Sequence, residues 1–228
     1  MSMQPRYYTV IASLPALEYF ETAKLAPINR VRLERRLAML TAEDKLELRR
    51  CERLIAWRSH GLQAEAGAIA KLYTDLREQT RYPALLAYVE HRLEMRTVIS
   101  ALRARRLGTP LDQLERPWGL GPLVAEIERR WDVPDFGLAP RLPWITHLRQ
   151  CIERQDALEL GRAVFEREWR FLTTIAEQHP FGFPEVLAYV MRRDIVERWQ
   201  TRDGPSAIRR FTSLIDEALD ARARPQFR

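Results

Sequence analysis

Apolar residues recur every three or four positions over most of this chain, which is the spacing of one face of an α-helix. The first expected helix begins near Asn29, and its apolar positions are Val31, Leu33, Leu37 and Leu40. Further segments show the same pattern: 41–58, 65–79, 83–106, 122–131, 143–154, 156–177, 184–202 and 206–223. In the segment 156–177 the expected apolar stripe consists of Leu158, Phe165, Leu172 and Ala176. The pattern therefore predicts an all-α protein with about nine helices.

Local signals mark several of the expected helix ends. Thr41-x-x-Asp44 has the spacing of a capping box, in which the Thr hydroxyl accepts a hydrogen bond from an unpaired backbone amide. Pro83 and Pro184 each suit a first helical position, where the backbone amide is not needed. The segment from Tyr7 to Ala12 differs, because its β-branched and aromatic residues favour a short extended strand.

One stretch of sequence occurs twice, at a constant offset of 101 residues. The segments 83–92 (PALLAYVEHR) and 184–193 (PEVLAYVMRR) share six of ten residues, and each follows an aromatic residue, Tyr82 or Phe183. Repeated units usually bury their apolar faces against one another, so duplication indicates architecture before chemistry. Two copies are too few for a solenoid. We therefore expect a small helical protein built from duplicated helical units.

The segment from 108 to 143 has a different composition. It contains four Gly and six Pro, and only one good helix, 122–131, fits within it. Its aromatic residues indicate that it packs and does not act as a loose linker: Trp118, Trp131, Phe136 and, just beyond it, Trp144. We predict an N-terminal helical unit (1–107), this packed connection (108–143) and a C-terminal helical unit (144–228). One continuous compact domain is the alternative.

No segment carries the residues of a familiar catalytic or metal-binding motif. Cys51 and Cys151 are far apart, which argues against a zinc site and against a disulfide-stapled secreted domain. Gly119-Leu-Gly121 lacks the preceding strand and third Gly of a dinucleotide-binding turn, and no Walker-type Gly-Lys-Ser/Thr occurs. None of the four His has Glu three positions before it, as a di-iron helix bundle requires. We expect a protein that is not an enzyme and holds no cofactor or metal.

The longest apolar run is too short to cross a bilayer. It extends from Tyr7 to Leu17, contains Pro15 and is followed directly by Glu18. An Ala-x-Ala cleavage site of a secretory signal is also missing. We expect a cytoplasmic protein without a membrane span of its own.

Three groups of residues resemble a pattern known from other proteins. They are Tyr7–Pro15 (YYTVIASLP), Asp135–Leu138 with Leu142–Trp144, and Phe181–Val190 with Ile195–Trp199 and Gly204. In this order they resemble a family of small bacterial proteins that are encoded beside V/A-type ATPase genes and have no settled function. The order of the motifs along the chain is a stronger signal than any one of them.

A more distant similarity is to the C (or d) subunit of V/A-type ATPases. The stretch from Leu93 to Gly108 is similar to the end of one helix in that family. The family's subunit has three repeated helical units and acts as a socket between the rotating central stalk and the membrane rotor ring. This chain is shorter and shows two repeats, and the resemblance carries no catalytic residues across.

The resemblance implies a non-enzymatic accessory or central-stalk-like subunit of a bacterial V/A-type ATPase, a helical adaptor between stalk and membrane rotor. Its partners would be ATPase subunits of the stalk or rotor ring, and it would meet the membrane only through that complex. Candidate partner-facing residues cluster near the end of one helix: Arg192, Arg193, Glu197, Arg198 and Trp199. Trp199 fits a core position equally well, because its spacing continues an apolar stripe.

The charge of the chain leaves one alternative open. The formal net charge is +6, and all but three of the 37 basic residues are Arg. Most of them alternate with acids, as in Glu166–Arg170, which is typical of a salt-bridged helix surface. The runs Arg49-Arg50 and Arg103–Arg106 nevertheless leave a basic helical nucleic-acid-binding or regulatory module as the second hypothesis. It ranks lower, because no expected helix is basic along a whole face.

Overall fold

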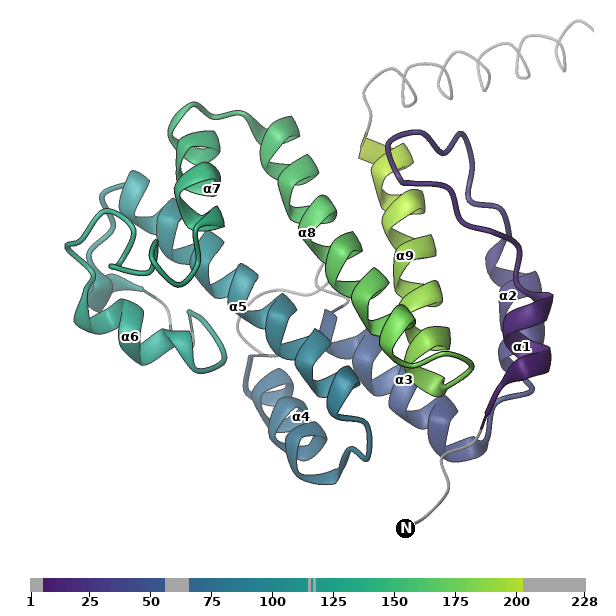
Figure 1. Cartoon of the computed structure of the whole chain (residues 1–228). Helices are drawn as coiled ribbons and strands as arrows, with labels where there is room; N and C mark the ends of the chain where they lie inside the picture. Colours follow the sequence, from purple (N-terminus) through teal and green to yellow (C-terminus); the bar gives the residue numbers. More distant parts are fainter. Residues whose placement is uncertain (1–5, 56–65, 115, 117, 203–228) are drawn as a thin grey trace, which may run out of the picture.

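The computed structural model describes residues 6–55, 66–114, 116 and 118–202 (Figure 1). Apart from an isolated bridge between Arg6 and Gly182, every regular element in these residues is helical. They are α1 (Tyr8–Ser13), α2 (Arg30–Leu37), α3 (Ala42–Ile55), α4 (Ala66–Gln79), α5 (Pro83–Arg106), the 3-10 helix η1 (Leu111–Gln113), α6 (Leu123–Arg129), α7 (Trp144–Glu153), α8 (Ala157–Gln178) and α9 (Phe183–Arg202). The predicted all-α class is confirmed for the described residues.

The helices are arranged around three long ones. The antiparallel helices α8 and α9 pack along much of their length, and α5 runs beside them (Figure 1). α6 and α7 lie at the far end of α5, whereas α1 and α2 lie on the outer side of α9 (Figure 1).

Two hydrophobic clusters form the interior of the described residues. The larger one joins α1, α3, the first half of α5, α8 and α9, and its bulkiest buried rings are Phe20, Tyr82, Tyr88 and Phe183. The second joins the later part of α5 to α6, α7 and the start of α8, around the fully buried Phe136. Both α5 and α8 contribute to both clusters. The predicted boundaries at 108 and 143 stay a prediction.

Most predicted helix ends agree with the structure. α5 begins at Pro83 and ends at Arg106, as expected. Side chains cap several helices: Asn29 accepts from the Arg32 amide at 2.9 Å, and Asp156 accepts from the Glu159 amide at 2.9 Å. Residues 56–58 and 65, at the ends of two predicted helices, and the predicted helix 206–223 lie outside the described residues.

The capping box at Thr41 is confirmed in one half only. The Thr41 hydroxyl accepts from the Asp44 amide at 3.2 Å, but the Asp44 carboxylate does not return to the Thr41 amide. The Tyr7 hydroxyl accepts from that amide instead, at 3.3 Å. Asp44 is fully buried and accepts hydrogen bonds from Tyr7, from Tyr82 at 2.7 Å and from Arg81 at 2.6 Å. The acid therefore joins the starts of α1, α3 and α5.

The strand expected from Tyr7 to Ala12 is wrong, because Tyr7 is the N-cap of α1 and the residues from Tyr8 to Ala12 lie within that helix. Extended pairing is limited to the bridge between Arg6 and Gly182 and to the Tyr7 amide, which donates to the Phe181 carbonyl at 2.6 Å. β-Branched residues favour a strand only where a partner edge is present. Here the turn between α8 and α9 supplies a partner for one residue pair.

The helical periodicity also misplaced two apolar residues. Val31 in α2 and Leu158 in α8 are 63% and 60% exposed, although each belonged to an expected buried stripe. Both lie in the first turn of a helix, where the chain has only begun to approach the core. Leu33, Leu37 and Phe165 are buried, as expected.

The segment from 108 to 143 packs closely against α5. The Thr97 hydroxyl donates to the Leu120 carbonyl at 2.8 Å and accepts from the Leu120 amide at 3.0 Å. A Cβ atom at Gly119 would lie 2.7 Å from the Thr97 methyl group, so only glycine allows this approach. The rings of Trp118 and Trp131 meet edge to face, with their centroids 6.1 Å apart.

The two repeated stretches begin α5 and α9, which start side by side and then diverge (Figure 1). The equivalent rings of Tyr82 and Phe183 are in contact, with centroids 4.6 Å apart. The equivalent tyrosines have different partners: the Tyr88 hydroxyl donates to Glu168 at 2.6 Å, and the Tyr189 hydroxyl donates to the Pro15 carbonyl at 2.9 Å. The repeat therefore provides two similar helix starts in unlike surroundings.

Candidate functional site

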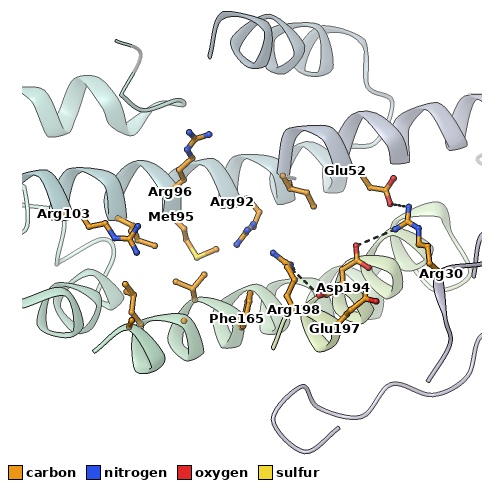
Figure 2. A pocket seen from close by; sticks show the side chains of 16 residues that line it. Arg30, Glu52, Arg92, Met95, Arg96, Arg103, Phe165, Asp194, Glu197 and Arg198 are labelled. Carbon is orange, nitrogen blue, oxygen red and sulfur yellow. Dashed lines mark hydrogen bonds and ion pairs between the residues drawn. The ribbon is translucent and has the colours of Figure 1, made fainter. Parts of the chain in front are cut away.

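A cleft of about 620 Å³ lies between α5 and the pair formed by α8 and α9 (Figure 2). We call it the arginine cleft, because five of its sixteen lining residues are arginines: Arg30, Arg92, Arg96, Arg103 and Arg198. Its apolar lining comes from α3, α5 and α8 and consists of Ile55, Met95, Ile99, Ala157, Leu160, Gly161, Val164 and Phe165. The remaining lining residues are the acids Glu52, Asp194 and Glu197.

Helical spacing explains why these residues share one surface. On α5 the lining residues are 92, 95, 96, 99 and 103, and on α8 they are 157, 160, 161, 164 and 165. Intervals of three and four residues place side chains on one face of a helix. Gly161 has no side chain, so the α8 wall is low at its middle. The two faces therefore oppose each other across the cleft.

A buried carboxylate fixes the middle of the cleft. Glu168 is fully buried behind the lining; it forms an ion pair with Arg92 at 2.8 Å and accepts from Arg198 at 3.5 Å and from Tyr88 at 2.6 Å. Burial raises the pKa of Glu168, but Arg92, Arg198 and the Tyr88 hydroxyl outweigh burial, so the net pKa lies below its usual value. Glu168 is thus ionised and positions both guanidinium groups, which point toward one another in Figure 2.

The acids of the cleft gather at one end, around Arg30 (Figure 2). Arg30 lies 2.9 Å from Glu52 and 4.0 Å from Asp194. Burial raises the pKa of both acids above their ordinary values, although the nearby arginines oppose that shift. Burial lowers the pKa of Arg96 to about 10; this residue lies beside Met95, and its side chain points away from α8 in Figure 2. Arg103 lies at the end of the cleft opposite to Arg30 (Figure 2). The cleft therefore has a balanced end and a basic end.

Two of the predicted partner-facing residues, Glu197 and Arg198, line this cleft. Arg192 is partly buried: its guanidinium lies 5.6 Å from the Trp169 ring centre and donates to the Ala188 carbonyl at 3.3 Å. Trp199 is half-buried and meets Phe20 edge to face, with the centroids 5.2 Å apart.

Arg193 does not lie on the surface. It is 1% exposed, donates to the Ile28 carbonyl at 3.0 Å and forms ion pairs with Asp194 at 2.9 Å and Glu197 at 2.8 Å. Its guanidinium fastens the segment before α2 to α9, which removes Arg193 from the surface that a partner could reach. That α9 acts as a partner surface stays a prediction for the other four residues.

The α5 wall of the cleft was not predicted from the sequence. Arg92 was noted only as part of the repeat, and Arg96 and Arg103 only within the stretch from Leu93 to Gly108 and the basic run Arg103–Arg106. Glu168 was noted only as one of the alternating acids of Glu166–Arg170. The available signal was the spacing of the three arginines, which places them on the same face as Met95 and Ile99. Arg92 also occupies the repeat position equivalent to Arg193. Both arginines pair with acids: Arg92 with the buried Glu168, and Arg193 with the exposed Glu197.

A smaller hollow lies between α5, α7 and α8. His91 stacks on Phe171 with ring centroids 4.3 Å apart, and the Arg167 guanidinium lies 4.7 Å from the Trp144 ring centre. Burial, together with Arg167 and Arg92, lowers the pKa of His91 to about 4. A neutral imidazole packed on a phenyl ring serves as part of the interior.

The described residues contain neither a candidate membrane span nor a candidate metal-binding cluster. None of the helices in the ranges given above is both long and apolar enough to cross a membrane. Among the same residues, no three or more His, Cys, Asp or Glu side chains gather in a way that would hold a metal ion.

A protein-family model matches residues 62–220, more than half of the chain, and its description is protein of unknown function, DUF2764. This chain belongs to the DUF2764 family. The matched region contains both repeated stretches and most of the arginine cleft, including Arg92, Glu168 and Arg198. No curated protein and no solved structure matches the chain. The family match thus covers most of the cleft, but it assigns no activity to it.

Proposed function

We propose that this DUF2764 protein is a non-enzymatic helical subunit that binds protein partners within a bacterial V/A-type ATPase. It would serve as an accessory or central-stalk-like adaptor between the stalk and the membrane rotor. The proposal includes the two resemblances described for the sequence. One is to the proteins encoded beside V/A-type ATPase genes, and the other is to the C (d) subunit. Two independent kinds of support, one structural and one from sequence, bear on it.

The arginine cleft is the observation that carries the proposal. It combines an apolar floor with arginines that are held in place by the buried Glu168, and Arg is among the residues most enriched at protein interfaces. A fixed guanidinium loses little side-chain entropy on binding, because its position is already set. These are the properties of a preorganised protein-binding surface.

The identity of the partner rests on sequence. The motifs Tyr7–Pro15, Asp135–Trp144 and Phe181–Trp199 follow one another as they do in the proteins encoded beside V/A-type ATPase genes. A torque-transmitting adaptor needs packed helices joined by buried contacts, and it needs no titratable couple. The ties made by Asp44, Glu168 and Arg193 suit such a part.

Affinity purification tests the proposal. A tagged copy of the protein is recovered from membranes of the cell that encodes it, at moderate salt and after nuclease treatment, and the bound proteins are identified by mass spectrometry. We expect subunits of the V/A-type ATPase in a constant ratio to the tagged protein. Recovery without any ATPase subunit contradicts the proposal. Bound proteins that disappear only on nuclease treatment would favour the nucleic-acid alternative.

A further inference from the structure

The middle of the arginine cleft has more hydrogen-bond donors than the described residues use. Each guanidinium carries five N–H groups. Within the described part of the chain, Arg198 donates to the Asp194 carbonyl and to Glu168, and Arg92 pairs with Glu168 alone. The Arg92 Nε atom is buried and has no hydrogen-bond partner there. Two positive groups thus share one carboxylate and retain donors for another acceptor.

Charge also differs along the cleft. The lining acids Glu52, Asp194 and Glu197 lie toward Arg30, and none of the three lies beside Arg103 (Figure 2). Arg103 is exposed at the rim of the cleft. A carboxylate is the protein group that matches closely spaced guanidiniums best, because it accepts from two N–H groups at once.

The shape of the lining indicates what would carry that carboxylate. The α5 face extends from residue 92 to residue 103, which is roughly 16 Å at 1.5 Å per residue. Met95 and Ile99 lie between the arginines of this face, and Leu160 and Val164 line the opposite wall. An amphipathic helix of about three turns presents apolar and acidic groups at this spacing, as other helices do when they bind in grooves.

We infer that the arginine cleft is a docking site for an acidic amphipathic helix of a partner subunit, with one of its carboxylates held between Arg92 and Arg198. The neighbouring apolar side chains of that helix lie on Met95, Ile99, Leu160 and Val164, and a second acid meets Arg103. This inference rests on the proposed function and names the surface through which it operates. Glu168 holds the two central arginines and does not touch the partner.

Site-specific crosslinking in the native cell tests this inference. A photoreactive amino acid is placed at Ile99 inside the cleft and, in a second strain, at Leu107, which is 76% exposed and lies outside the cleft. We expect the Ile99 position to crosslink to an ATPase subunit through a peptide rich in Glu or Asp, and Leu107 to give little of that product. Helical circular dichroism and an unchanged melting temperature confirm that each variant is folded.

A matched pair of charge reversals gives the second readout. Arg103 lines the cleft, whereas Arg106 is exposed on the next turn of α5 and does not line it. We expect Arg103→Glu to lower the Ile99 crosslink about tenfold or more, and Arg106→Glu to leave it within about twofold. Neither residue contacts Glu168, so both variants keep the central ion pairs.

The outcomes separate the inference from the proposed function. If ATPase subunits crosslink only at Leu107, or if both charge reversals act equally, the docking inference is wrong and the proposed function stands. If the protein reaches no ATPase subunit from either position, both are wrong. A small anion that blocks the Ile99 crosslink without any crosslinked peptide from a subunit would also overturn the docking inference.

Discussion

Among the residues that the structure describes, buried charges are few, and they have defined partners. Glu168 holds Arg92 and Arg198, Asp44 receives Tyr7, Tyr82 and Arg81, and Arg193 binds a carbonyl and two acids. Desolvation makes an isolated buried charge costly, so these groups stabilise the fold only as complete sets. Removing one member therefore costs more than the lost contact alone.

The substitution Glu168→Gln tests, at the centre of the cleft, whether removing one member of a buried charge set costs more than the lost contact alone. The substitution leaves Arg92 and Arg198 close together without their shared anion. We expect a loss of about 3–5 kcal/mol in the free energy of unfolding, measured by urea denaturation followed by circular dichroism. Glu34→Gln is the control, because Glu34 forms an exposed pair with Arg30 and should cost no more than about 1 kcal/mol. Equal losses for the two variants would show that Glu168 is not a special ion-pair centre.

His91 predicts a component of acid sensitivity. Its folded-state pKa of about 4 lies below the ordinary value of 6.5, so the neutral form is favoured by folding. The contribution of neutral His91 to the free energy of unfolding is present above pH 6.5 and is lost as pH falls toward 4. The loss amounts to about 3 kcal/mol. Arg92 and Arg167 strengthen the effect, whereas Glu168 opposes it.

Comparison with His91→Phe isolates this component, because Phe preserves stacking on Phe171 and does not titrate. We expect the parent protein to lose about 3 kcal/mol more than the variant between pH 7.5 and pH 4, measured by urea unfolding at each pH. A parent–variant difference that stays constant over this range contradicts the assignment. Other acids titrate in both proteins and cancel in the comparison.

Arg193 was expected to face a partner because it clusters with the other four candidates near the end of one helix. Its acids, Asp194 and Glu197, are one and four residues away and were visible, but the Ile28 carbonyl that it binds lies 165 residues earlier. Such a partner cannot be inferred from local spacing. The repeat gave a usable hint, since the equivalent Arg92 also pairs with an acid.

At the scale of elements, helical periodicity and end signals located α2–α9 well, because they depend on residues that are near in sequence. The short helix α1 was missed for the opposite reason. Its position depends on contacts with the turn before α9 and with Asp44, and its own residues favour a strand. The cleft depends on how α5 and α8 face each other, which no single segment encodes.

Because Asp44 joins the starts of α1, α3 and α5, its substitution should affect all three helices. Asp44→Ala removes the acceptor of the Tyr7 and Tyr82 hydroxyls and the partner of Arg81. We expect a loss of about 2–4 kcal/mol in the free energy of unfolding and faster hydrogen exchange in α1 and in the first turns of α3 and α5. Glu43→Ala, at the exposed neighbouring position, is the control. Faster exchange confined to α3 would show that Asp44 does not join the three helices.

For the whole molecule, α5 and α8 extend through both hydrophobic clusters and so connect them. The α6–α7 end is thus joined to α9 through packed helices, and the arginine cleft lies between α5 and the pair formed by α8 and α9 (Figure 2). Composition and periodicity were sufficient to predict an all-α protein. The proposed function rests on the order of the family-like motifs and on the chemistry of the cleft.

Native electrophoresis of gently solubilised membranes tests the central claim most directly. Each band is analysed by mass spectrometry for this protein and for the subunits of the V/A-type ATPase. We expect the protein to migrate with the assembled ATPase, in a fixed ratio to its stalk subunits, and to leave that band when salt is raised. Migration of the protein away from the ATPase at every salt concentration would contradict its role as a subunit.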